Sequence, residues 1–112
     1  MKMNPNARQS GFSSPVTSLG SLFPLGQVVV TANCDRTLAK DALRRLAFYS
    51  LVRHSQGDWG DIPEADEVAN DEALAAGCGR LFSAYHLSQD VQIWIITEGD
   101  RSCTTILLPE DY

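Results

Sequence analysis

The stretch that decides the fold is LFSAYHLSQDVQIWIITEGDRSCTTILL, residues 81–108. Three segments of it alternate apolar and polar side chains with a period of two, as expected of strands with one buried face. These segments are 81–87, 91–98 and 103–108. The connections between them, 88–90 and 99–102, have the length of hairpin loops and contain Gly and Asp, which tolerate positive φ angles. The pattern predicts a three-stranded antiparallel meander.

A short strand and a long helix are expected before this meander. The β-branched run at 28–30 predicts a strand, because three adjacent apolar residues suit a strand that is covered on both faces or one that begins a mixed sheet. Asn33 or Asp35 is then expected to cap a helix that runs to about His54, since its apolar residues keep i, i+3 and i, i+4 spacing. Gly57 is expected to end this helix.

A second helix is predicted between Asp61 and Gly77. Asp61 is placed to accept hydrogen bonds from the first turn, Pro63 suits that turn, and Glu64 can reach back as in a capping box. The predicted order of elements is β-α-α-β-β-β. This is an α+β fold in which two helices pack on one face of a sheet that contains the C-terminal antiparallel meander.

The chain is expected to hold one folded domain, residues 23–112, behind an N-terminal tail. Its 112 residues suit a single domain. Residues 1–22 are rich in Ser and show no helical or alternating period, so they are expected to form a disordered tail. A docking arm anchored by Phe12 is the alternative.

The charge balance excludes some classes of partner. Nine Lys and Arg residues against fourteen Asp and Glu residues give a net charge of −5, which argues against a nucleic-acid binder that grips phosphates. No apolar run approaches the ~20 residues that a membrane span needs. The three widely spaced cysteines, Cys34, Cys78 and Cys103, are typical of a cytoplasmic protein.

Neither a metal ion nor a cofactor is expected. The cysteines and the two histidines, His54 and His86, form no pair with metal-ligand spacing. The glycine-rich patterns that bind nucleotides and the G-x-S-x-G pattern of serine hydrolases are absent from the sequence.

The segment RHSQGDWGD, residues 53–61, is the most unusual local cluster. One interpretation makes His54 a general base or proton donor that Asp58 orients, with Trp59 as a pocket wall. The other is structural: a histidine suits the negative end of a helix, Gly57 terminates the helix, and Trp59 plugs the edge of the core. The structural interpretation is favoured, because one His and one Asp without a nucleophile do not define a reaction.

The predicted hairpin tip at 97–102 is the second candidate site. Its carboxylates, Glu98 and Asp100, could act in acid–base chemistry or hold a divalent ion, with Arg101 beside them. The alternative is a polar turn, because Gly and Asp serve to turn the chain and an Arg among acids is usually a surface pair. The turn is the favoured interpretation.

Several segments resemble a group of small bacterial proteins that are described as plasmid-related. The segments are FPLGQVV (23–29), GDWGD (57–61), NDEALAAGCG (70–79), GRLFSAYHL (79–87) and IWIITEGDRSCTTILLPEDY (93–112). The resemblance is most specific in the last of them. It implies that genes for such proteins travel on plasmids, integrated elements and prophages, and it implies no particular reaction.

The predicted order of elements is also similar to that of toxins of the RelE and ParE type, which cut ribosome-bound messenger RNA or poison gyrase. The residues to test under that analogy are His54, Arg80, Tyr85 and Arg101. An RNase of that kind needs cations around the scissile phosphate, whereas acids outnumber Arg101 in and after the meander. These acids are Asp90, Glu98, Asp100, Glu110 and Asp111.

Three functions follow for comparison. The first is a non-enzymatic accessory protein of a mobile element, which binds a protein of host defence or DNA handling. The second is a small toxin, hydrolase or nuclease that uses His54 with Asp58, or Arg80, Tyr85 and Arg101. The third is a DNA mimic, which requires the acids to form one continuous stripe. Because the last predicted strand is expected to be an exposed edge, the protein is expected to be a monomer or a homodimer.

Overall fold

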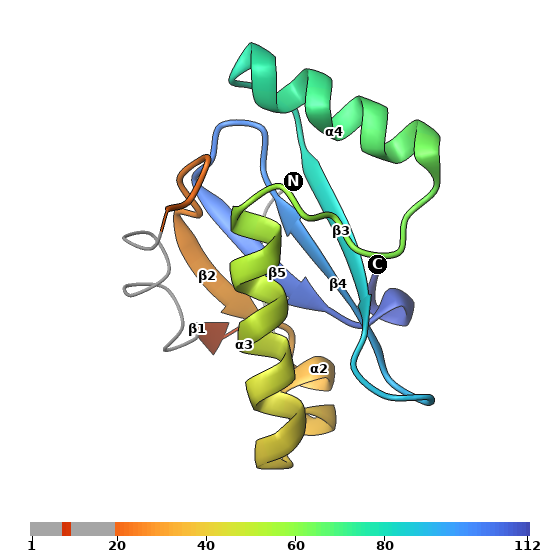
Figure 1. The fold of residues 1–112 in the computed structure, drawn as a ribbon. Helices are drawn as coiled ribbons and strands as arrows, with labels where there is room; N and C mark the ends of the chain where they lie inside the picture. The colour runs from red at the N-terminus through yellow and green to blue at the C-terminus, as the bar shows by residue number, and fades with distance from the viewer. Residues whose placement is uncertain (1–7, 10–19) are drawn as a thin grey trace.

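The computed structural model describes residues 8–9 and 20–112. They form a five-stranded sheet with the strand order β1-β2-β5-β4-β3 and several helices (Figure 1). In chain order the elements are β1 (Arg8–Gln9), β2 (Gln27–Val30), α2 (Ala32–Thr37), α3 (Asp41–Ser55), α4 (Glu64–Ala76), β3 (Leu81–His86), β4 (Gln92–Thr97), β5 (Cys103–Leu107) and the 3-10 helix η1 (Pro109–Asp111). The α+β class and the antiparallel meander are confirmed. In this part of the chain, every helix is too short or too polar to cross a lipid bilayer.

The predicted tail, residues 1–22, lies largely outside the described residues, and so does Phe12. Within it, β1 pairs with β2 in antiparallel orientation, with Gln9 opposite Val29. The backbone N–H of Leu22 donates to the carbonyl oxygen of Ser55 at 2.8 Å, which joins Leu22 to the end of α3.

The last strand of the meander lies inside the sheet. β5 pairs in antiparallel orientation with β4, where Thr97 lies opposite Thr104, and in parallel with β2, where Val28 lies opposite Thr104. The prediction of an exposed edge at this strand is therefore wrong. A parallel neighbour needs a long crossover connection, and the helices between β2 and the meander supply it.

The outer edge of β3 is closed by other parts of the chain. The side-chain amide of Asn70, on α4, donates to Phe82 O at 2.7 Å and accepts from Phe82 N at 3.0 Å. Next along the edge, Ala84 N donates to Trp59 O at 3.2 Å and Ala84 O accepts from Asp61 N at 2.8 Å. These bonds use the backbone groups through which an edge strand would otherwise pair with a second sheet.

The first predicted helix is two helices, α2 and α3, and its predicted N-cap at Asn33 or Asp35 is wrong. Thr31 caps α2, because its Oγ1 accepts from Cys34 N at 3.2 Å. The side chain of Asn33 instead donates to Asp111 Oδ1 at 3.0 Å. The chain bends after Leu38, whose side chain is only 1% exposed. Burial of this leucine in the core outweighs the local preference for a continuous helix.

The start of the second predicted helix also differs. α4 begins at Glu64 with Pro63 as its N-cap and no side-chain cap hydrogen bond, so the capping box at Asp61 is wrong. Asp61 instead serves the β3 edge, and its carboxylate lies 3.0 Å from His86 Nδ1. The predicted end at Gly77 is confirmed, since Gly77 has φ of 74° and forms a left-handed cap.

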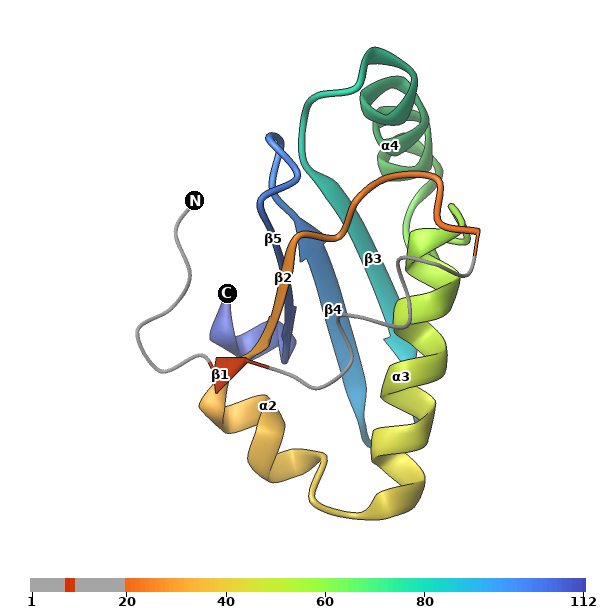
Figure 2. The same cartoon turned by 90° about the vertical axis from the view of Figure 1, so that its left-hand side faces the viewer.

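The core lies between the sheet and the helices. α3 and α4 lie on one side of the sheet, with α4 along the edge at β3 (Figure 2). Because side chains alternate along a strand, β4 sends Ile93 and Ile95 into this core and Trp94 to the opposite face. The helices contribute Cys34, Ala47 and Leu51, and the bend after α2 contributes Leu38.

Candidate functional site

His54 lies in the core at the last turn of α3. Its side chain is fully buried, between the rings of Phe23 and Trp59, whose centroids lie 5.4 and 5.6 Å from that of the imidazole. Both ring nitrogens are hydrogen-bonded, Nδ1 to Ser83 Oγ at 2.5 Å and Nε2 to Thr97 Oγ1 at 2.9 Å. The histidine therefore joins α3 to β3 and β4.

A terminal carbonyl sets the direction of this chain of hydrogen bonds. Thr104 Oγ1 donates to Leu25 O at 2.7 Å, and a carbonyl oxygen can only accept. Thr104 Oγ1 must then accept from Thr97 Oγ1, 2.8 Å away, which leaves Thr97 to accept from His54. The neutral imidazole consequently carries its proton on Nε2, and its Nδ1 accepts from Ser83.

This environment keeps His54 uncharged. Burial and, to a lesser degree, the positive charge of Arg101 lower the pKa of His54 from 6.5 to about 3. A neutral ring with both nitrogens engaged has no free position for taking a proton from a substrate. His54 therefore acts as a polar link within the core.

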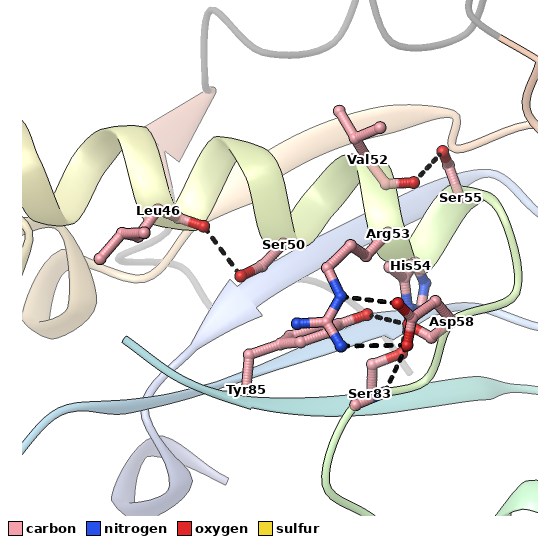
Figure 3. Close-up of polar contacts among 10 residues, drawn as sticks. Leu46, Ser50, Val52, Arg53, His54, Ser55, Asp58, Ser83 and Tyr85 are labelled. Carbon is pink, nitrogen blue, oxygen red and sulfur yellow. Dashed lines mark hydrogen bonds and ion pairs between the residues drawn. The ribbon is translucent and has the colours of Figure 1, made fainter. Parts of the chain in front are cut away.

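Asp58 does not orient His54. Its carboxylate accepts from Arg53, with Nε at 2.7 Å from Oδ2 and Nη2 at 3.1 Å from Oδ1. Figure 3 shows this pair, with Arg53 reaching from α3 toward Asp58 beside Tyr85. The bonds from Arg53 hold the pKa of Asp58 below its usual value.

Tyr85 is likewise engaged within the fold. It is 2% exposed, and its hydroxyl donates to Asp58 O at 2.7 Å. The guanidinium of Arg53 lies 4.9 Å from the centroid of its ring. Burial raises the pKa of Tyr85, so the phenol stays protonated. Tyr85 packs in the core and anchors the segment that follows α3.

The glycines of GDWGD have separate roles in the same segment. Gly57, with φ of 79°, follows the end of α3. Gly60 has φ of 74° and lies so close to Ala84 O that any Cβ there would collide with it. Between them, Trp59 donates from Nε1 to Asp71 Oδ1 at 3.1 Å. The motif forms a strap that closes the β3 edge.

Arg101 connects the hairpin tip to α4. Its Nη1 donates to Gly79 O at 2.6 Å, and its Nη2 to Ala73 O at 3.2 Å. Ala73 O is one of the last carbonyls of α4, where a cation also opposes the negative end of the helix dipole. Positive φ was expected at Gly or Asp in this loop, but Arg101 has it, at 62°. Its contacts hold it in that conformation.

The two acids of the hairpin tip form part of the turn. Asp100 Oδ1 accepts from the N–H and the hydroxyl of Ser102, at 3.0 and 2.6 Å. Glu98 is 7% exposed, and its backbone N–H donates to Cys103 O at 2.9 Å. The two candidate regions do meet, since Thr97 contacts His54. They meet in packed core.

An open groove lies on the other face of the sheet. It has a volume of about 260 Å³ and is lined by Asp66, Arg80, Phe82, Trp94, Ile96 and Tyr112. The Trp94 ring meets Phe82 and Tyr112 edge to face, with centroids 5.0 and 5.7 Å apart. Arg80 Nη1 donates to the Tyr112 hydroxyl at 2.9 Å, and its guanidinium lies 5.5 Å from the Tyr112 ring centroid.

The walls of this groove come from distant parts of the sequence. Phe82 and Ile96 are partners in the β3–β4 register, and Trp94 shares their face of the sheet. Tyr112 is held near them because Asp111 bonds to the N-cap residue of α2: its Oδ2 accepts from Thr31 Oγ1 at 2.6 Å. Sequence analysis identified Arg80 as a candidate but missed the groove, whose only sequence signal is the aromatic residues on one strand face.

Metal binding has no support in the described part of the chain. No group of three or more His, Cys, Asp or Glu side chains there could hold a metal ion. Burial raises the pKa of the Cys34 thiol to about 12, so this thiol is protonated at neutral pH.

Comparison with known proteins adds no family. No family model matches the chain, and neither the curated proteins nor the solved structures contain a match. The resemblance to plasmid-related proteins therefore stays a prediction, and the candidate site is argued from its own geometry.

Proposed function

We propose that the protein is a small non-enzymatic accessory protein that binds another protein through the groove of Phe82, Trp94 and Tyr112. The observation that carries this proposal is the groove itself, an aromatic hollow of about 260 Å³. The sequence resemblance supports a setting on a plasmid or prophage, with a partner in host defence or DNA handling. The free thiols of Cys34, Cys78 and Cys103 support a cytoplasmic location.

The state of the catalytic candidates favours binding over catalysis. A reaction needs an acid, base or nucleophile that can reach a substrate. His54 is enclosed and neutral, Tyr85 donates to a backbone carbonyl, and Arg101 donates to several. Each of these side chains has a role in holding the fold.

The composition of the groove favours a protein partner. Aromatic residues and arginine are the types most enriched where proteins bind one another, and they contribute most of the binding energy. Phe82 and Trp94 are half-buried, so their rings are held in place, while Tyr112 is 63% exposed. A rigid aromatic surface loses little conformational entropy when a partner covers it.

Co-purification of host proteins with matched variants tests the proposal. Tyr112→Ala removes a wall of the groove, and Tyr49→Ala removes a tyrosine of nearly equal exposure, 62%, from α3. We expect a partner that binds the wild-type and Tyr49→Ala proteins, and binds Tyr112→Ala at least about tenfold more weakly. Measurement of the affinity with the purified partner makes the comparison quantitative. A partner that is held equally by both variants would contradict the groove as its binding site.

A further inference from the structure

The two charged side chains that line the groove, Arg80 and Asp66, differ in their contacts within the protein. Arg80 is already bound to Tyr112, through its hydrogen bond of 2.9 Å and its position over the ring. Asp66, on α4, also lines the groove. Among the residues that the structure describes, no side chain makes an ion pair or hydrogen bond with the Asp66 carboxylate. A negative group thus faces an aromatic hollow without an internal counter-ion in that part of the chain.

The helix that carries Asp66 strengthens this negative character. α4 has the sequence EADEVANDEALAA, with five acids and no basic residue. Asp66 lies one turn before Asn70, which bonds to Phe82, so both lie on the helix side that faces β3. On the side of the groove formed by α4, these acids attract a cation and repel an acidic partner.

Aromatic rings beside a carboxylate form a favourable place for a cationic side chain. A guanidinium or ammonium group is attracted to the face of a Trp or Tyr ring, and its alkyl stem packs on apolar side chains. The protein contains this contact already, since Arg80 lies over Tyr112 and Arg53 over Tyr85. In the groove, Trp94 supplies the aromatic ring for such a contact and Asp66 supplies the negative charge.

We infer that the groove binds an arginine or lysine side chain from a basic segment of the partner protein. The stem lies on Phe82 and Ile96, and the charged head lies against Trp94 and pairs with Asp66. This inference rests on the proposed function and names the chemistry of the partner. It makes the acidic α4 part of the recognition surface.

Peptide titration of the ¹⁵N-labelled full chain tests the inference. The probes are blocked Gly-Arg-Pro-Arg-Gly, the same peptide with citrulline for arginine, and the same peptide with glutamate for arginine. The two indole N–H signals provide a reporter and an internal control, because Trp94 lines the groove and Trp59 is 5% exposed and bonded to Asp71. We expect the arginine peptide to shift the Trp94 signal and leave the Trp59 signal unchanged. We expect binding of the citrulline peptide to be at least about tenfold weaker.

Two variants with the same change of charge locate the counter-ion. Asp66→Asn is expected to weaken binding of the arginine peptide about tenfold. Glu67→Gln removes an exposed acid from the same helix and is expected to change it less than about twofold. Equal effects of the two variants would overturn the role of Asp66. Circular dichroism confirms that both variants are folded.

The remaining outcomes separate this inference from the proposed function. Equal binding of the citrulline peptide, or tighter binding of the glutamate peptide, would overturn cation recognition while the groove stayed a binding site. A Trp94 signal that responds to single-stranded oligonucleotide and not to the arginine peptide would also overturn it. If no probe moves the Trp94 signal, the inference fails, whereas the proposed function fails only if Tyr112→Ala retains the partner.

Discussion

Each face of the sheet has a nitrogen-containing side chain next to aromatic rings, but one of these side chains is enclosed and the other lies at an open groove. On the covered face, His54 lies between Phe23 and Trp59, is fully buried, and has both ring nitrogens bonded within the protein. On the other face, Arg80 lies beside Tyr112 at the rim of an open groove. The residue types are similar, but the first cluster is enclosed, whereas the second lies at an open groove.

The difference between the two faces follows from the energetic cost of burying a polar group. A polar atom removed from water must find its partners inside the protein, so a buried cluster becomes closed and contributes to stability. A polar atom at an open groove can find its partner in another molecule. The covered face is thus expected to respond to substitution by losing stability, and the groove by losing binding.

Replacement of His54 has the largest expected effect. His54→Ala leaves a cavity and removes the partners of Ser83 and Thr97, so we expect the free energy of unfolding to fall by about 3–5 kcal/mol. Urea denaturation measures this. The matched variant on the other face, Trp94→Ala, removes a half-buried side chain and is expected to cost about 1–2 kcal/mol. The reverse order of the two values would break the comparison.

Loss of Asn70 tests the closed edge of the sheet. Asn70→Ala removes both hydrogen bonds to the Phe82 backbone, and we expect a loss of about 2–3 kcal/mol. It also frees part of the β3 edge, so self-association should increase in analytical ultracentrifugation. Asn33→Ala is the control, because it removes the side-chain hydrogen bond from Asn33 to Asp111, which lies away from this edge. A monomeric Asn70→Ala protein with unchanged stability would show that the side chain does not protect the edge.

The neutral state of His54 predicts a pH dependence of stability. The folded pKa is about 3 and the unfolded value 6.5, so only the unfolded chain takes up a proton between them. The contribution of neutral His54 to the free energy of unfolding is therefore fully present well above pH 6.5. It decreases as the pH falls below 6.5, with a slope that approaches about 1.4 kcal/mol per pH unit. Urea midpoints from about pH 7 to pH 5 measure the slope. His54→Gln keeps the carboxylates that titrate at lower pH, and its slope should be smaller by this amount. Equal slopes would mean that His54 is charged or exposed.

Local sequence patterns predicted the helices and strands better than they predicted which of these elements lie side by side. Alternation along 81–108 identified the meander, because a strand with one buried face records that face in its own sequence. The parallel pairing of β2 with β5 could not be predicted in this way, since the two strands are joined only through the rest of the fold. The bend after Leu38 was missed as well, because burial of Leu38 overrides a helical pattern. The cap at Thr31 was also missed.

The candidate sites show the same limit more strongly. The cluster of His54 and Asp58 is real in sequence, but the two side chains have different partners, Ser83 and Thr97 for one and Arg53 for the other. The groove needs Asp66 and Tyr112, which lie far apart in the chain. Sequence reasoning can identify residues with chemical potential, whereas the fold decides which of them remain accessible.

The smallest expected effect on stability belongs to Arg80. Arg80→Gln removes an exposed hydrogen bond to Tyr112 and a cation–π contact, so we expect the free energy of unfolding to change by less than about 1 kcal/mol. Urea denaturation checks this value, and nuclear Overhauser contacts between Trp94 and Tyr112 report whether the wall of the groove stays in place. A loss of more than about 2 kcal/mol would show that the groove stabilises the fold as His54 does. The two faces would then differ only in exposure, and the argument that one of them is kept for a partner would lose its physical basis.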